Sequence, residues 1–128
     1  MTDIAILFIM IFLHIIDDFV LQPVCLSKLK QKDFWKRNTS EEDYNKLYKH
    51  DYFAALVIHG LSWSIMIHLP FLLMGNCHVV LIGCFIICQC AWHSYIDNEK
   101  ANKKKINLIT DQLLHFAQIF ISWVLLTL

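Results

Sequence analysis

The segment that decides the fold is IAILFIMIFLHIIDDFVLQ, residues 4–22, in which a long apolar run ends in a histidine and two aspartates. Its length matches the roughly 17–25 residues that a helix needs to cross the hydrocarbon core of a membrane. Ionisable side chains at that depth are costly unless they face one another inside a bundle of helices. The segment therefore predicts a transmembrane helix that contributes polar groups to a buried site.

The rest of the chain has the same apolar character. Hydrophobic residues make up 57% of the 128 positions, more than the roughly 45–50% apolar content of soluble domains. A soluble helical bundle would need polar faces that repeat every three or four residues, and the later apolar stretches lack them. We therefore expect one all-α integral-membrane domain over residues 1–128, a bundle of four transmembrane helices at about residues 4–22, 52–74, 77–98 and 106–128. The first helix lacks a basic leader and a small-residue cleavage site, so it is expected to be permanent.

Positive charge is confined to two parts of the chain. Of the 11 Lys and Arg residues, seven lie between Lys28 and Lys49 and four between Lys100 and Lys105. Basic loops stay in the cytoplasm under the positive-inside rule. We therefore expect a bacterial inner-membrane protein with both basic loops in the cytoplasm and both termini on the outer side.

The linker at residues 23–51 is expected to be cytoplasmic and to contain a short amphipathic interfacial helix. Thr39 and Glu42 have the spacing of a capping box, in which two side chains satisfy the free N–H groups at a helix start. The residues that would share one face of this helix are Tyr44, Leu47 and Tyr48.

Three histidine–aspartate pairs are separated by four residues along the chain. On a helix this spacing places both side chains on one face, one turn apart. The pairs are His14 with Asp18, His93 with Asp97, and Asp111 with His115, and His59 adds a fourth histidine. At 1.5 Å per residue, each histidine lies roughly 10–15 Å from the cytoplasmic end of its helix. We therefore expect all seven side chains to meet inside the bundle.

Four imidazoles and three carboxylates are ligands for a divalent metal, with Zn the first expectation and Mn or Fe as alternatives. Two ions bridged by carboxylates would fit, and so would one ion whose histidines are oriented by the aspartates. Two other interpretations stay open: polar residues that lock helix packing, and a proton or ion pathway.

Several neighbouring residues have less certain roles. Asp17 is expected to point away from His14 and Asp18, as a solvated helix-end charge or a substrate contact. Lys100 is expected either to neutralise a phosphate or to extend towards the membrane surface. The residues expected to support the site or simply to pack are Ser62, Trp63 and Gln118.

One ordered pattern covers nearly the whole chain. It reads His14-x3-Asp18-Phe19-x2-Gln22, then His59, then His93-x3-Asp97-x2-Lys100, then Asp111-Gln112-x2-His115. It resembles an uncharacterised family of small bacterial and phage integral-membrane proteins of unknown function, with HxxxDFxxQ and DQxxH signatures. It is more loosely similar to membrane-bound metal-dependent hydrolases with HxxxD helices, in which the long basic linker has no counterpart.

The function expected from these residues is metal-dependent hydrolysis of an ester or phosphoester in an amphiphilic or lipid-like substrate at the cytoplasmic leaflet. The expected catalytic residues are Asp18, Asp97, Lys100 and Asp111. No GxSxG sequence is present, which favours activated water over a covalent intermediate. The alternatives are a metal or proton translocating or sensing protein, and a non-enzymatic membrane partner protein such as a phage factor.

Membrane lipid is the expected partner, and association into homo-oligomers is compatible with the sequence. Nucleic acid is not expected: the net charge of zero is uninformative on this point, and no patch in the sequence suggests such a partner.

Overall fold

The computed structural model of the chain describes residues 2–74 and 79–128. This part of the chain is all-helical and contains no strand. The four long helical segments are α1 (Asp3–Ile15) with its continuation η1 (Ile16–Leu21), α5 (Asp51–Met74), α6 (Val79–Ala101) and α7 (Leu108–Thr127). Each is long and apolar enough to cross a membrane. The expected all-α class and the four membrane-capable helices are thus confirmed, while residues 77 and 78 of the expected third span lie outside the described residues.

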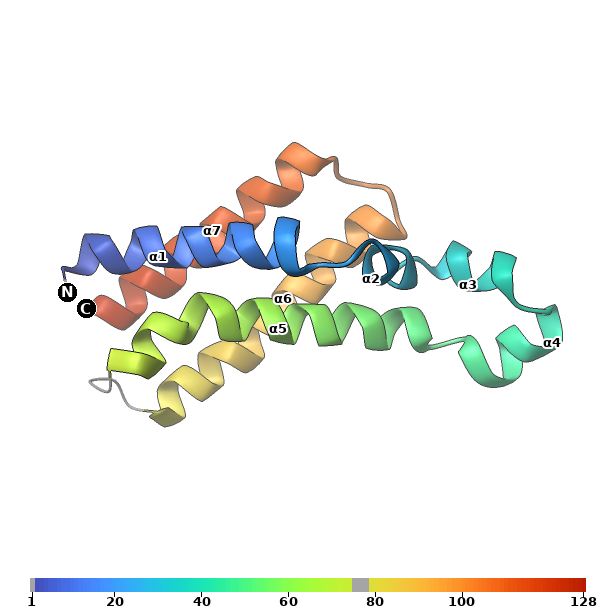
Figure 1. Cartoon of the computed structure of the whole chain (residues 1–128), viewed down its shortest axis with the longest axis horizontal. Helices are drawn as coiled ribbons and strands as arrows, with labels where there is room; N and C mark the ends of the chain where they lie inside the picture. Colours follow the sequence, from blue (N-terminus) through green and yellow to red (C-terminus); the bar gives the residue numbers. More distant parts are fainter. Residues whose placement is uncertain (1, 75–78) are drawn as a thin grey trace.

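The long helices alternate in direction along the chain. α1 and α6 run one way and α5 and α7 the other, so that both termini lie at the same end of the bundle (Figure 1). The Trp123 indole N–H donates to the Asp3 carbonyl at 2.7 Å and joins these two ends. α1 packs against α5 and α7, and α6 packs against the same two helices.

The bundle buries polar side chains and leaves many large apolar ones uncovered by protein. Phe8 is 67% exposed and Val80 is 80% exposed, whereas the four predicted ligand histidines are almost completely buried. This distribution suits lipid on the outside and a polar site within. An apolar cluster fills the half of the bundle near the termini, and its buried members are Ile6, Met10, Trp63, Ile67, Phe71, Ile82 and Ile119.

Helices α5 and α6 are in close contact at Gly60. A Cβ atom built at this glycine would lie 2.4 Å from Ser94 Oγ and 2.9 Å from the Cys90 carbonyl oxygen. Small residues at such a crossing allow two membrane helices to come into backbone contact. Because His59 precedes Gly60 and His93 precedes Ser94, this contact also fixes the distance between two site histidines.

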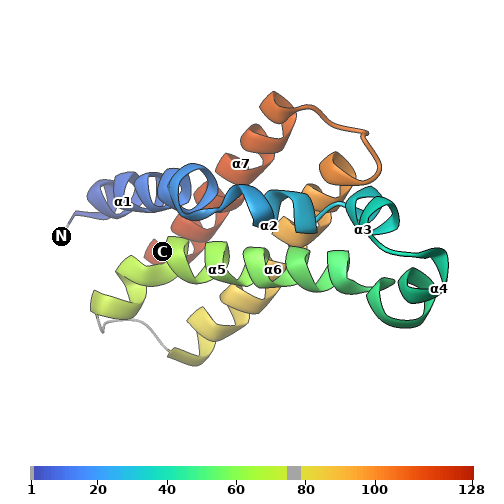
Figure 2. The ribbon, with the colours of Figure 1, turned by 45° about the vertical axis from the view of Figure 1, so that its right-hand side comes forward.

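The linker between η1 and α5 forms α2 (Val24–Leu29), α3 (Lys32–Asn38), α4 (Glu41–Asp43) and the π-helical turn η2 (Tyr44–Tyr48). These short helices lie at the end of the bundle opposite the termini, and α3 and α4 extend beyond it (Figures 1 and 2). The linker and the connection between α6 and α7 therefore lie at the same end of the bundle (Figure 1).

The capping box starts one residue later than predicted. Ser40, not Thr39, is the N-cap of α4, and its hydroxyl accepts from the Asp43 N–H at 3.1 Å. The Thr39 hydroxyl instead donates to the Trp35 carbonyl at 2.8 Å, because it still belongs to the end of α3. The expected pairing of Thr39 with Glu42 is therefore wrong.

Candidate metal centre

The seven residues predicted as ligands meet inside the bundle, at the end that faces the linker. We call them the His–Asp cluster: His14, Asp18, His59, His93, Asp97, Asp111 and His115. The members come from all four long helical segments, and each side chain is at most 9% exposed. The i,i+4 pairs lie on common faces, with N–O distances of 3.7, 3.8 and 3.5 Å in the order of the chain.

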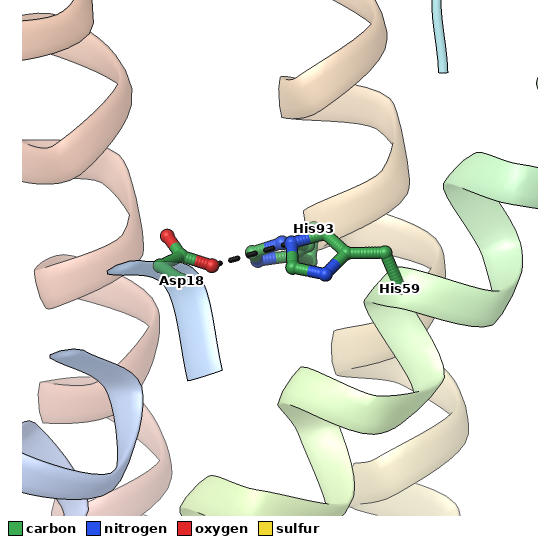
Figure 3. Close-up of side chains that lie close together, drawn as sticks. All are labelled: Asp18, His59 and His93. Atoms are coloured by element: carbon green, nitrogen blue, oxygen red, sulfur yellow. Dashed lines mark ion pairs between the residues drawn. The ribbon is translucent and has the colours of Figure 1, made fainter. Parts of the chain in front are cut away.

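Asp18, His59 and His93 form one group in this cluster. Each offers a ligand atom within 4.8 Å of the others. Asp18 Oδ1 lies 3.2 Å from His59 Nε2. Figure 3 shows the Asp18 carboxylate directed at the His59 ring, with His93 beside it.

His93, Asp97 and His115 form a second group with the same 4.8 Å limit. The Asp97 carboxylate lies between the two histidines, 3.8 Å from His93 Nε2 and 3.5 Å from His115 Nε2. The two imidazole rings stack with centroids 4.1 Å apart. His93 belongs to both groups and so occupies the centre of the cluster.

Several buried polar atoms of the cluster make no hydrogen bond within the described residues. These atoms are Asp18 Oδ1, His59 Nε2, His93 Nδ1 and Nε2, Asp111 Oδ1, and His115 Nε2. Buried polar groups are normally paired, because an unsatisfied one costs about 1–3 kcal/mol. All these atoms are of the kinds that ligate divalent metals. The donor set therefore fits a metal site.

A hydrogen-bond chain fixes the state of His14. The Trp63 indole N–H, which can only donate, donates to His14 Nδ1 at 2.7 Å. His14 Nε2 therefore bears the proton, which it donates to Gln112 Oε1 at 3.1 Å. The Gln112 amide nitrogen in turn donates to Asp18 Oδ2 and Asp111 Oδ2, at 3.3 and 3.1 Å. Both His14 nitrogens are occupied, so His14 orients the carboxylates and offers no free lone pair.

A second chain fixes the tautomer of His115. Gln118 donates through Nε2 to Gln89 Oε1 at 2.7 Å, and Gln89 donates to Ser122 Oγ at 2.7 Å. The Gln118 oxygen is therefore the acceptor facing His115 Nδ1, at 3.1 Å. This leaves the lone pair of His115 on Nε2, the nitrogen directed at the cluster.

Replacing Trp63 by phenylalanine tests the first chain. Trp63→Phe keeps an aromatic ring but removes the N–H that holds His14, so Gln112 and the two carboxylates lose their fixed orientation. Partners that orient metal ligands typically contribute 10–100-fold to affinity, and we expect metal affinity to fall about tenfold. Competition titration with a chelator measures this change, and Trp123→Phe at the chain termini is the control. Unchanged affinity in Trp63→Phe would contradict the orienting role.

Asp17 lies elsewhere than expected. Its side chain is buried, accepts from the Ser62 hydroxyl at 2.8 Å and lies 3.7 Å from His59 Nδ1. The helix widens into a π turn here, with the Gln22 N–H donating to the Asp17 carbonyl at 3.0 Å. The wider turn allows Asp17 and Asp18 both to face the interior, so the expected solvated position of Asp17 is wrong. Such turns are frequent at functional sites.

Two lysines neutralise part of the carboxylate charge. Lys100 Nζ lies 2.5 Å from Asp111 Oδ2, and Lys30 Nζ lies 2.5 Å from Asp97 Oδ2. Lys30 comes from the linker and was missing from the predicted site. When ionised, the carboxylates of Asp17, Asp18, Asp97 and Asp111 carry four negative charges against these two positive ones. The difference of two matches one divalent cation when the imidazoles are neutral.

A cavity of about 340 Å³ leads from the linker end to the cluster. Asp18, His59, Asp97 and Asp111 line its inner part, and Lys30, Lys100 and Lys104 are also on its walls. A small molecule can therefore reach the carboxylates and the lysines together.

The fold and site define a class: a membrane-capable four-helix protein with a buried histidine–aspartate site below a lysine-lined cavity. A family model described as "Protein of unknown function (DUF3307)" matches residues 6–128, and the chain belongs to this family. No curated protein and no solved structure matches the chain.

Proposed function

We propose that the protein is an integral-membrane metal-dependent hydrolase that cleaves an ester or phosphoester bond in an amphiphilic substrate at the cytoplasmic leaflet. The main support is the set of buried nitrogen and oxygen atoms without hydrogen-bond partners that four helical segments bring together, of which those of Asp18, His59 and Asp111 belong to residues that line one cavity. A bound divalent cation would ligate these atoms together, although two of the carboxylate oxygens also lie 3.2 and 3.5 Å from histidine nitrogens of the cluster.

The proposed ligands are the cluster members with a free lone pair. They are Asp18, His59, His93, Asp97, Asp111 and His115, while His14 supports them from behind. Zn²⁺ suits this imidazole–carboxylate set best, with Mn²⁺ or Fe²⁺ as alternatives. The two groups that share His93 accommodate one ion or two.

A divalent cation at this position would polarise a carbonyl or phosphoryl oxygen and make water a nucleophile at neutral pH. The carboxylates of Asp18, Asp97 and Asp111 hold the cation or accept a proton from water. Lys100 and Lys30 stabilise negative charge that develops on the substrate. No side-chain nucleophile is required for this chemistry.

The proposed orientation places the linker and the α6–α7 connection in the cytoplasm and both termini outside, with a short linker helix at the membrane surface. In a chain that retains only Cys25, an impermeant maleimide added outside intact cells should label nothing until the membrane is opened. A chain without native cysteines that carries Thr127→Cys should be labelled at once. The reverse pattern would overturn the orientation.

Elemental analysis and a hydrolysis assay test the function. Protein purified without added metal or a histidine tag should contain one or two ions per chain, and chelation should abolish cleavage of a fluorogenic phospholipid. Less than about 0.2 ion per chain would instead favour a packing role for the cluster, since structural and catalytic sites both bind tightly. If the protein contains metal but does not cleave the substrate, the proposed hydrolase activity is wrong and the proposed metal site stands.

Translocation of a metal or proton receives less support. The polar chain from His115 through Gln118 and Gln89 ends at Ser122. Beyond it, the apolar cluster occupies most of the half of the bundle near the termini, where only Ser64 and His68 among the described residues of α5 add buried polar side chains. Metal uptake by proteoliposomes would reverse this ranking.

A further inference from the structure

We propose that the substrate is a phosphate-bearing amphiphile whose phosphate group lies between the ammonium groups of Lys30 and Lys100. Its hydrocarbon tail leaves the cavity between η1 and α7. This inference rests on the proposed function and narrows its substrate class.

Lys30 is held in place as a binding residue would be. Its side chain is 9% exposed, and its ammonium group donates to Asp97 Oδ2 at 2.5 Å and to Gln22 Oε1 at 3.3 Å. The backbone on either side is tied to the end of α6, because Asn102 donates to the Lys30 carbonyl at 3.0 Å and accepts from the Lys32 N–H at 2.7 Å. The linker thus adds an ordered, largely desolvated positive charge to the cavity, where charge-assisted hydrogen bonds are strong.

The cavity wall carries the carboxylates of Asp18, Asp97 and Asp111 beside its lysines, so it favours a phosphate over a neutral ester once a divalent cation is bound. Lys30 from the linker and Lys100 from α6 both line the cavity, and Lys104 adds a third ammonium group. A neutral carboxylic ester offers no charge to match them, whereas a phosphate monoester carries about −1.5 to −2 at pH 7. Lysine is a common phosphate ligand in proteins.

The cavity also has an apolar edge. Phe19 of η1 and Leu108 of α7 line it, and their side chains are 58% and 53% exposed. Gln112 of α7 donates to Asp18 of η1 at 3.3 Å, so this apolar edge lies beside a contact between the two segments. Both segments belong to membrane-capable helices, so these exposed apolar side chains lie where lipid chains would contact the protein. A tail can therefore enter the bilayer while its phosphate stays on the lysines.

Calorimetric titration of the Zn-loaded protein in neutral detergent tests both parts of the inference. The probes are butyl phosphate, which has a head group and almost no tail, and dodecyl phosphate. Lys30→Gln and Lys100→Gln should each lower the affinity for both probes at least tenfold. Lys28→Gln and Lys103→Gln, neighbouring lysines outside the cavity, should change binding less than twofold. The Lys100 side chain is 36% exposed and that of Lys30 is 9% exposed, so Lys100→Gln disturbs the packing less, although it also removes the ion-pair partner of Asp111.

The tail is tested by Phe19→Ala against Phe8→Ala, an equally exposed phenylalanine near the other end of the same segment. Phe19→Ala should lower the affinity for dodecyl phosphate at least threefold and leave the affinity for butyl phosphate unchanged. Phe8→Ala should change neither affinity. If wild-type protein binds the two probes equally well, the substrate is a soluble phosphate ester and the proposal of an amphiphilic substrate is wrong. Zn-loaded protein that binds neither probe would overturn the inference alone, whereas absence of metal from the wild type would overturn the proposed function itself.

Discussion

His93→Gln should abolish metal binding by the purified protein, leaving less than about 0.1 ion per chain. His93 is fully buried and belongs to both candidate ligand groups, and neither of its ring nitrogens has a hydrogen-bond partner within the described residues. Glutamine has similar polarity but is a much poorer ligand than imidazole. Elemental analysis measures the loss, and a chelator titration should show at least a hundredfold lower affinity. Wild-type metal content in His93→Gln would contradict the assigned centre.

The same measurement counts the ions. Asp18→Asn removes a ligand of the first group alone, and His115→Gln removes one of the second alone. If two ions bind, each variant should lose about one of them; if one ion binds, only one variant should lose it. His68→Gln is the matched control, because His68 is an equally buried histidine outside the cluster, and it should keep the full content.

Much of this site could be predicted because its residues follow helical periodicity. A separation of four residues puts two side chains on one face of a helix. The bounds of the apolar stretches indicate how deep in the bundle these side chains lie. These two rules suffice for the seven cluster residues, which the structure brings within a few ångströms of one another. The same periodicity predicts the four long helices, which are a property of local sequence.

Residues positioned by non-local folding could not be predicted in this way. Lys30 contacts Asp97 across 67 positions of sequence, and this contact depends on the linker folding back onto α6. Asp17 faces the interior because of a π turn, and its local sequence shows no signal for one. Gln112 was visible only within the DQxxH signature, and its role depends on helices α1 and α7 lying side by side. A search for donors able to orient ligands from adjacent helices would have been the only guide to it.

Gly60→Ala should produce the largest loss of stability among conservative substitutions in the bundle. The added methyl group would meet Ser94 Oγ at 2.4 Å and the Cys90 carbonyl at 2.9 Å, so α5 and α6 must separate. Overpacking of this kind costs about 1–3 kcal/mol. Since the His59 and His93 rings lie 5.0 Å apart across this contact, metal affinity should fall as well. Unfolding in detergent followed by tryptophan fluorescence, with and without Zn²⁺, measures both effects.

Gly83→Ala is the matched control on α6, because a Cβ atom there would meet nothing within 4 Å. It should leave stability unchanged or raise it by up to about 1 kcal/mol, the usual helix preference for alanine over glycine. Adding Ser94→Gly to Gly60→Ala removes the 2.4 Å contact but not the contact with the Cys90 backbone, so it should restore only part of the loss. If Gly60→Ala and Gly83→Ala behaved alike, α5 and α6 would not be in backbone contact at this point. The distance between His59 and His93 would then have to be set by other packing.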